Sequence, residues 1–182
     1  PGFVDDDGTT TILKLSDMAS GVQRVQPLRY GRKGAPLAGF GATTQSVALA
    51  QGPVAAQARL VKLPDGRLQA TLVYGSGEHR MSVSTFRWLA DGSVDPQPAN
   101  PSRSDLTVAD LGGGAIDLDV VVVPDGTSVL AIWQASQRIV LRLDDNGLHD
   151  LSFGTAGTTR IDGVVGFPGL ATSRIRIRVA LQ

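Results

Sequence analysis

The sequence predicts an all-β fold, and two observations support this prediction. Short runs rich in Val, Leu, Ile and Thr are separated by Asp-Gly or Asn-Gly turns, for example at Asp65-Gly66 and Asn146-Gly147. This alternation is typical of antiparallel hairpins, because glycine adopts the positive φ that tight turns need. In addition, no segment of helical length has a 3.6-residue apolar period, and 22 Gly and 10 Pro would interrupt most helices.

The same order of strands and turns occurs about three times, with a period of roughly 60 residues. The pattern is clearest in 120–154, where β-rich stretches are separated by a Pro-Asp-Gly turn, a loop and an Asp-Asn-Gly turn. Residues 60–92 carry the same series up to the second turn, and residues 7–41 carry a weaker version. The two turn glycines of each copy are 26, 26 and 21 residues apart: Gly8 and Gly34, Gly66 and Gly92, and Gly126 and Gly147.

One four-stranded sheet cannot bury both of its faces, so a repeat of this length favours several sheets packed around a common axis. We therefore predict a fold of the β-propeller type, with about three four-stranded antiparallel blades and a C-terminal strand. The single domain covers 1–182, with blade-like repeats at about 1–55, 56–113 and 114–172 and a closing strand at 173–182. A β-sandwich is the alternative, but its strands would not repeat in register.

Residues 112–160 resemble a known family. The apolar strand ending in Pro-Asp-Gly126, the Arg142-Leu-Asp-Asp-Asn-Gly147 turn and the stretch Asp150-Leu-Ser-Phe-Gly-Thr-Ala-Gly157 are similar to the delta-60 repeat, a bacterial β-propeller repeat. The resemblance is looser before residue 112, and the middle copy has residues 95–100 where Ser-Phe-Gly is expected, which implies a reshaped outer connection. The resemblance implies a propeller fold and an extracellular, periplasmic or cell-surface location, and it brings no catalytic residues.

The two ends of the sequence are complementary. Residues 174–182 are predicted to form a strand that stops where the other copies continue into Pro-Asp-Gly. The N-terminus reaches Asp7-Gly8 at once, as if its leading strand were missing. We therefore expect the last strand to complete the first blade, either within this chain or in a second chain, so that two chains would form a six-bladed ring. The expected partners are a second copy or the rest of a longer propeller chain.

The composition excludes several kinds of partner and chemistry. Lys and Arg total 17, as do Asp and Glu, so there is no net charge to attract nucleic acid or an anionic membrane. Cysteine is absent, which excludes disulfides, thiolate metal sites and thiol redox chemistry. The longest apolar runs, such as 120–123, are far shorter than the roughly 20 residues that span a bilayer. We expect no nucleic acid partner, no membrane span and no cofactor.

Five residues are candidate contacts for a ligand or partner: Arg174, Arg176, Arg178, His79 and His149. The arginines alternate with apolar residues, so they would share one strand face, which could bind a phosphate or polyanion or form a solvated, charge-protected edge. The histidines lie in or beside predicted loops, without the serine, cysteine or carboxylate arrangement of a catalytic triad. No catalytic or metal-binding residue is predicted.

Two further features have a structural and a functional interpretation. The acidic stretches 5–7 and 144–146 each precede a glycine and could bind calcium, but neither has the spacing of a calcium loop with its distal Glu. Turn chemistry is the preferred interpretation, since Asp or Asn before Gly is what a turn requires. Trp88 and Trp133 are expected to fill the space between blades, rather than to form an exposed platform for a glycan or peptide.

The function favoured by these observations is a non-catalytic binding or scaffold module of an exported bacterial repeat protein, which engages a protein or glycan. The alternative is a fragment of a propeller enzyme, a hydrolase or lyase, with its site at the central channel. Several acids or histidines converging on the axis would favour the enzyme. A lining of apolar side chains and backbone would favour the binding module.

Overall fold

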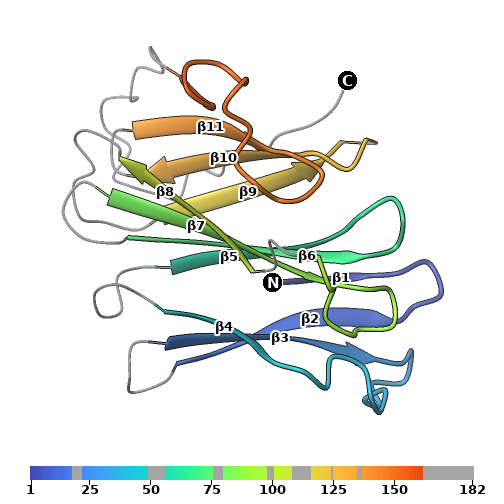
Figure 1. The fold of residues 1–182 in the computed structure, drawn as a ribbon. Coiled ribbons are helices and arrows are strands. Elements are labelled where there is room, and N and C mark those ends of the chain that lie inside the picture. The colour runs from blue at the N-terminus through green and yellow to red at the C-terminus, as the bar shows by residue number, and fades with distance from the viewer. Residues whose placement is uncertain are drawn as a thin grey trace, which may run out of the picture.

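The structure is a computed structural model, which describes residues 1–17, 22–48, 56–75, 80–97, 101–107, 116–123, 125–134 and 137–161. Across these residues the regular structure is β throughout, without a helix. The strands form three antiparallel sheets stacked on one another (Figure 1). The predicted all-β class is therefore confirmed, whereas the predicted closing strand at 173–182 lies outside the described residues.

Each sheet is built from strands that follow one another in the sequence. Sheet 1 has the order β1-β2-β3-β4 and consists of β1 (Gly2–Val4), β2 (Thr10–Asp17), β3 (Val22–Tyr30) and β4 (Gln45–Ala48). Sheet 2 has the order β5-β6-β7-β8 and consists of β5 (Ala56–Lys62), β6 (Leu68–Gly75), β7 (Arg80–Trp88) and β8 (Ser102–Thr107). Sheet 3 has the order β9-β10-β11-β12 and consists of β9 (Ile116–Val122), β10 (Ser128–Gln134), β11 (Gln137–Leu143) and β12 (Thr158–Arg160).

The hairpin turns have the same geometry in the three sheets. In the turn after each first strand, a glycine N–H donates to the carbonyl three residues earlier at 2.8–2.9 Å, in the pairs Gly8 with Asp5, Gly66 with Leu63 and Gly126 with Val123. The turn after each third strand has the same bond at 2.7–2.9 Å, in the pairs Gly34 with Gly31, Gly92 with Leu89 and Gly147 with Asp144. The six donor glycines have φ between 78° and 88°, which a residue with a Cβ rarely adopts.

Two apolar layers hold the stack together, one on each side of sheet 2. Successive residues of a strand point to opposite faces, so sheet 2 has two faces, which we call A and B. Face A includes Leu72, Phe86 and Trp88 and packs on Leu13 and Val25 of sheet 1. Face B includes Val73, Met81 and Val83 and packs on sheet 3, at Leu118, Leu130 and Leu141. Sheet 2 is therefore buried on both faces.

Strand register assigns the same two faces in the other sheets. The pair Ile12–Leu28 of sheet 1 corresponds to Ala70–Phe86 and Leu130–Leu141, so these pairs define face A. The pair Thr11–Arg29 corresponds to Gln69–Arg87 and Val129–Arg142, which lie on face B. At both junctions of the stack, face A of one sheet packs on face B of the sheet before it.

The prediction that the first unit lacks its leading strand is wrong. β1 pairs with β2 from Gly2 to Val4, and Leu13 N also donates to Pro1 O at 2.8 Å. β1 has three residues where β5 and β9 have seven each. The four residues before the first turn are enough for this short ladder, but they are too few to show an alternating pattern in the sequence.

The two tryptophans differ in burial. Trp88 is fully buried and stacks on Phe86, with the ring centroids 6.3 Å apart, which confirms the expectation of a core residue. Trp133 is half-buried on face B of sheet 3, and the guanidinium carbon of Arg138 lies 4.6 Å from the centroid of its ring.

Candidate binding site

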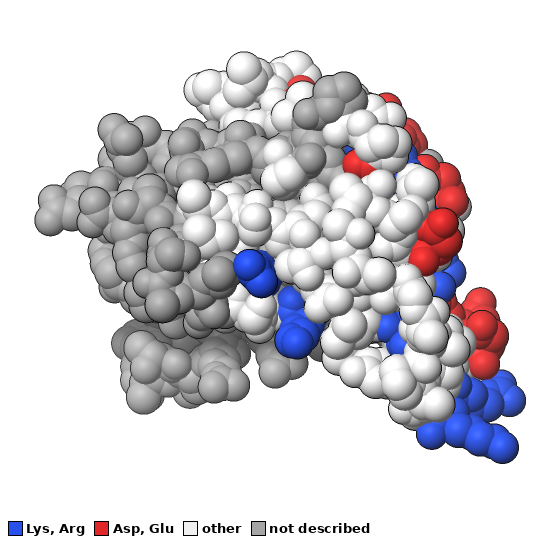
Figure 2. Space-filling model, turned by 60° about the horizontal axis from the view of Figure 1, so that its bottom comes forward, with Lys and Arg blue, Asp and Glu red and all other residues white. Residues whose placement is uncertain are grey.

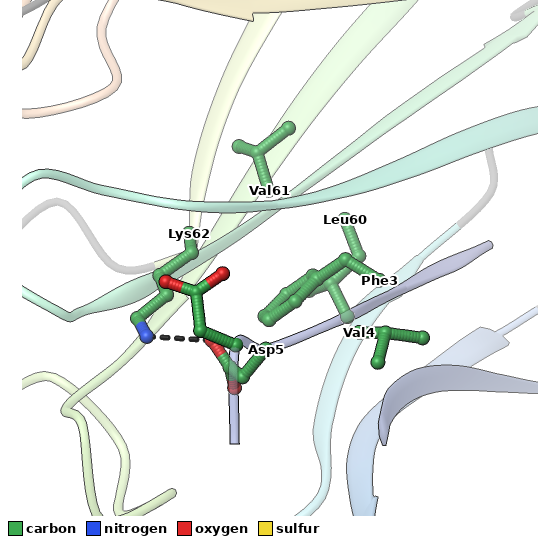
Figure 3. A pocket seen from close by; sticks show the side chains of 7 residues that line it. Phe3, Val4, Asp5, Leu60, Val61 and Lys62 are labelled. Atoms are coloured by element: carbon green, nitrogen blue, oxygen red, sulfur yellow. Dashed lines mark hydrogen bonds and ion pairs between the residues drawn. The ribbon is translucent and has the colours of Figure 1, made fainter. Parts of the chain in front are cut away.

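A hollow of about 460 Å³ opens between the first strands of sheets 1 and 2 (Figure 3). β1 and the turn after it form one side, and β5 forms the other. β1 and β5 contact each other across the junction of sheets 1 and 2, as β5 and β9 do across the junction of sheets 2 and 3. Its lining consists of Phe3, Val4, Asp5, Asp6, Leu60, Val61 and Lys62.

The turn after β1 fixes the acidic side of the hollow. Asp5 N donates to Thr9 O at 2.8 Å, so the backbone of Asp5 is held where β1 ends. The Asp7 carboxylate accepts hydrogen bonds from Thr9 N at 2.8 Å and from Thr9 Oγ1 at 2.7 Å, and these bonds lower the pKa of Asp7. Asp7 therefore serves the turn, while Asp5 and Asp6 line the hollow.

Asp5 is held between two cations. Lys62 Nζ lies 2.6 Å from Asp5 Oδ1, and this ion pair joins β5 to the end of β1 (Figure 3). Arg29 Nη2 lies 3.4 Å from Asp5 Oδ2, and the Arg29 guanidinium lies over the ring of Phe40 at 4.3 Å from its centroid. Both carboxylate oxygens thus contact cations of the protein, so neither is placed to transfer a proton to a molecule in the hollow.

The rest of the lining is mainly apolar. Phe3 and Leu60 lie close together between β1 and β5 (Figure 3), and Leu60 is only 5% exposed. Val4 at the rim is 67% exposed, and the Lys62 side chain keeps 46% of its surface exposed despite its ion pair. Apolar walls with a few polar groups at the rim are typical of binding sites, where burial of apolar surface gives affinity and polar groups give orientation.

Of the five candidate residues from the sequence, the structure describes His149, which does not line this hollow. His149 is half-buried in sheet 3, where its Nε2 lies 2.8 Å from Gly157 O. A Cβ on Gly157 would lie 2.3 Å from the same Nε2, so the ring occupies the space beside that glycine. His79, Arg174, Arg176 and Arg178 lie outside the described residues.

The acidic turns have the hydrogen bonds expected of turns. Asp144 Oδ1 accepts from Asn146 N at 2.9 Å and from Leu148 N at 2.8 Å, so this carboxylate caps the turn that Gly147 closes. Within the part of the chain that the structure describes, no group of three His, Asp or Glu side chains could hold a metal ion.

Sequence reasoning missed an arginine that recurs five residues before the second turn glycine of each copy: Arg29, Arg87 and Arg142. Arg87 is 2% exposed, and its Nε and Nη2 donate to Gln69 Oε1 at 3.0 and 2.8 Å. Its Nη1 donates to the Asp145 carbonyl of sheet 3, and burial lowers the pKa of Arg87. The constant spacing to the glycine was a signal that could have revealed this position.

Comparisons of the chain with protein-family models, with curated proteins and with solved structures gave no match. Among the described residues, no helix has the length and apolar character needed to cross a membrane.

Proposed function

We propose that the chain is a non-catalytic binding or scaffold module that engages a protein or glycan at the hollow between β1 and β5. The observation that carries this proposal is the chemistry of the lining. Phe3, Val4 and Leu60 form the apolar part of the lining, and the Asp5 carboxylate is held by Lys62 and Arg29. Such a surface suits binding of an amphipathic group better than it suits proton transfer.

A propeller is the architecture that best accounts for the stack. β1 approaches β5 and β5 approaches β9, so the first strands follow one another along one side of the three sheets. In a propeller the first strands would surround the central channel, and the hollow would open into that channel. The turn glycines at equivalent positions support three copies of one repeat. We retain the relationship to the delta-60 repeat, an exported bacterial location and association through the terminal strands as parts of this proposal.

The alternative, a fragment of a propeller hydrolase or lyase, requires several acids or histidines that converge on the channel. The described lining has two acids, Asp5 and Asp6, of which Asp5 is engaged by cations, and no histidine. The binding module is therefore the better supported of the two.

A panel of oligosaccharides and peptides tests the proposal directly. The purified chain is screened against the panel, and the best hit is titrated by calorimetry. We expect Lys62→Ala to weaken this binding about tenfold, which corresponds to loss of roughly 1.4 kcal/mol at the rim of the hollow. Lys33→Ala is the matched control, because Lys33 is an exposed lysine in the turn after β3, away from the lining.

Equal affinity of both lysine variants would contradict binding at the hollow. Hydrolysis or elimination of a panel glycan by the purified chain, lost in Asp5→Asn, would favour the enzyme instead.

A further inference from the structure

Sheet 1 differs from the other two sheets in that no described sheet covers its face A. Val4 on this face is 67% exposed, and Ile12, Leu28 and Tyr30 are half-buried. The residues that correspond to Leu28 in sheets 2 and 3 are Phe86 and Leu141, which are 0% and 1% exposed. The face is apolar at Ile12, Leu28 and Tyr30, whereas Lys14 and Gln26 occupy the next pair of positions, where sheets 2 and 3 have Leu72–Ser84 and Ile132–Ile139.

The correspondence extends to the neighbouring pair of residues. Thr10–Tyr30 in sheet 1 occupies the place of Leu68–Trp88 in sheet 2 and of Ser128–Leu143 in sheet 3. Leu68, Trp88, Ser128 and Leu143 are all buried at a junction. On the part of face A nearest the turns, sheet 1 thus keeps apolar side chains at Ile12, Leu28 and Tyr30, where sheets 2 and 3 pack on the face B of the preceding sheet.

Figure 2 brings the sheet 1 end of the stack forward. Most of the visible surface that is not grey is uncharged, with basic side chains scattered in it and acidic side chains gathered along one edge. Face A itself carries the exposed cations Lys14 and Arg24, and its apolar part lies around Ile12, Leu28 and Tyr30. Few charges over that part lower the cost of removing water from it, which favours docking of another apolar face there.

The other end of the stack presents a face B. On sheet 3 this face includes the half-buried residues Val121, Val129 and Val140. Val121 occupies the position of Val61, which packs against the core between sheets 2 and 3. The two end faces of the stack are therefore of the two kinds that pack on each other twice within the chain.

Given the propeller arrangement proposed above, on which this inference rests, we propose that face A of sheet 1 binds face B of sheet 3 in a second copy of the chain. The contact continues the A-on-B packing of both internal junctions, so the occupant is a sheet of the same kind. A contact between two different surfaces of one molecule is heterologous, and it closes into a ring if the rotation per chain fits the full circle. Two copies would then contribute six sheets.

Mixed cysteine cross-linking tests this contact, because the chain has no native cysteine. At the internal junction of sheets 2 and 3, Gln69 Nε2 donates to Ser128 Oγ at 2.9 Å. The corresponding positions on the two end faces are Val129 and Thr10. Thr10→Cys and Val129→Cys are therefore prepared as separate proteins, mixed, and treated with a short bifunctional maleimide.

We expect a cross-linked dimer in the mixture and at least tenfold less of it in either variant alone. Leu28→Asp in the Thr10→Cys protein is expected to remove the dimer, while Leu37→Asp is the matched control, since Leu37 is 44% exposed in the turn after β3. A dimer from Thr10→Cys alone, or no dimer in the mixture, would overturn the inference. Ligand binding at the hollow is measured separately by the panel, so a chain that binds a ligand without forming this dimer refutes the assembly and leaves the proposed function intact.

Discussion

Sheets 1 and 2 share their strand order, their turn geometry and an arginine at the same register position, but they differ in what covers them. Sheet 2 lies between two apolar layers, whereas sheet 1 has a described layer only on its face B. Equivalent positions in these two sheets therefore have the same backbone and different surroundings. The local sequence therefore determines the hairpins, while the neighbouring sheets determine how much each side chain contributes to stability.

The arginines at equivalent positions of sheets 2 and 3 also differ in what surrounds them. Arg87 of sheet 2 is buried between sheets and donates to Gln69 and to the backbone of sheet 3. Arg142 of sheet 3 is 37% exposed and donates through Nε to Asp150 Oδ2 of its own sheet at 2.6 Å. The same residue type thus joins sheets in one place and stabilises a single hairpin in another.

The largest expected effect separates Trp88 from Tyr30, which occupy one register position in sheets 2 and 1. Trp88→Ala should lower the free energy of unfolding by about 4 kcal/mol, because it leaves a cavity at a fully buried site. Tyr30→Ala should cost about 1 kcal/mol in the monomer, since its face has no described cover. Urea unfolding at low protein concentration measures both free energies of unfolding. Equal losses would contradict the difference in burial between the two positions.

A second pair of variants probes the turns. Gly92 and Gly34 have φ of 85° and 78°, so alanine at either position costs about 1 kcal/mol of backbone strain. A Cβ on Gly92 would also lie 2.5 Å from Gly41 N of sheet 1, whereas a Cβ on Gly34 meets nothing within 4 Å. We expect Gly92→Ala to cost about 3 kcal/mol in total and Gly34→Ala about 1. Thermal unfolding of the two variants measures the fall in Tm that each substitution causes. A similar fall for both would show that sheets 1 and 2 do not meet at Gly92.

A third pair compares the arginines. Arg87→Met should cost about 2 kcal/mol, because it leaves Gln69 Oε1 and the Asp145 carbonyl without this donor at a buried junction. Arg142→Met should cost less than about 1 kcal/mol, as is usual for ion pairs that water reaches. Denaturant titration gives both values. A larger loss for Arg142→Met would mean that the buried arginine does not join sheets 2 and 3.

The smallest effect concerns pH. Asp91 caps the second turn of sheet 2 by accepting from Ser93 Oγ at 2.6 Å and from Ser93 N at 2.9 Å, and these bonds lower the pKa of Asp91 below 3.8. Sheet 1 has Lys33 at the corresponding position. Since the folded-state pKa is lowered, the stabilisation is present above pH 3.8 and is lost as the pH falls through the lower folded value.

Asp91→Asn should therefore lower Tm at pH 6 and lower it less at pH 3, while Lys33→Asn should give the same small change at both values. Scanning calorimetry at the two pH values measures these differences. A Tm change for Asp91→Asn that is independent of pH would contradict the role of the carboxylate charge.

The features that could be predicted from the sequence are the local ones. Asp-Gly turns and β-rich runs give the hairpins, because glycine and aspartate act within a few residues of the turn. The burial of Trp88 could also be predicted, because this residue lies on a predicted strand of the repeat. β1 was missed because three residues are too few for an alternating pattern.

The hollow could not be predicted, because it depends on the approach of β1 to β5 and on the ion pair between Asp5 and Lys62, which are 57 residues apart. No short-range pattern in the sequence encodes a contact of that kind. The interaction of Arg87 with sheet 3 was missed for the same reason, although its spacing to Gly92 marked the position.

The proposed propeller requires that the sheets fan out from their first strands around one axis. Pulsed electron spin resonance measures the distance between two spin labels at engineered cysteines. We compare this distance for two pairs of equivalent positions in sheets 2 and 3. We expect labels at Ser93 and Leu148, in the turns after the third strands, to be farther apart than labels at Asp65 and Asp125, in the turns after the first strands. Equal distances, or a shorter one for the first pair, would indicate flat layers and would contradict the propeller arrangement.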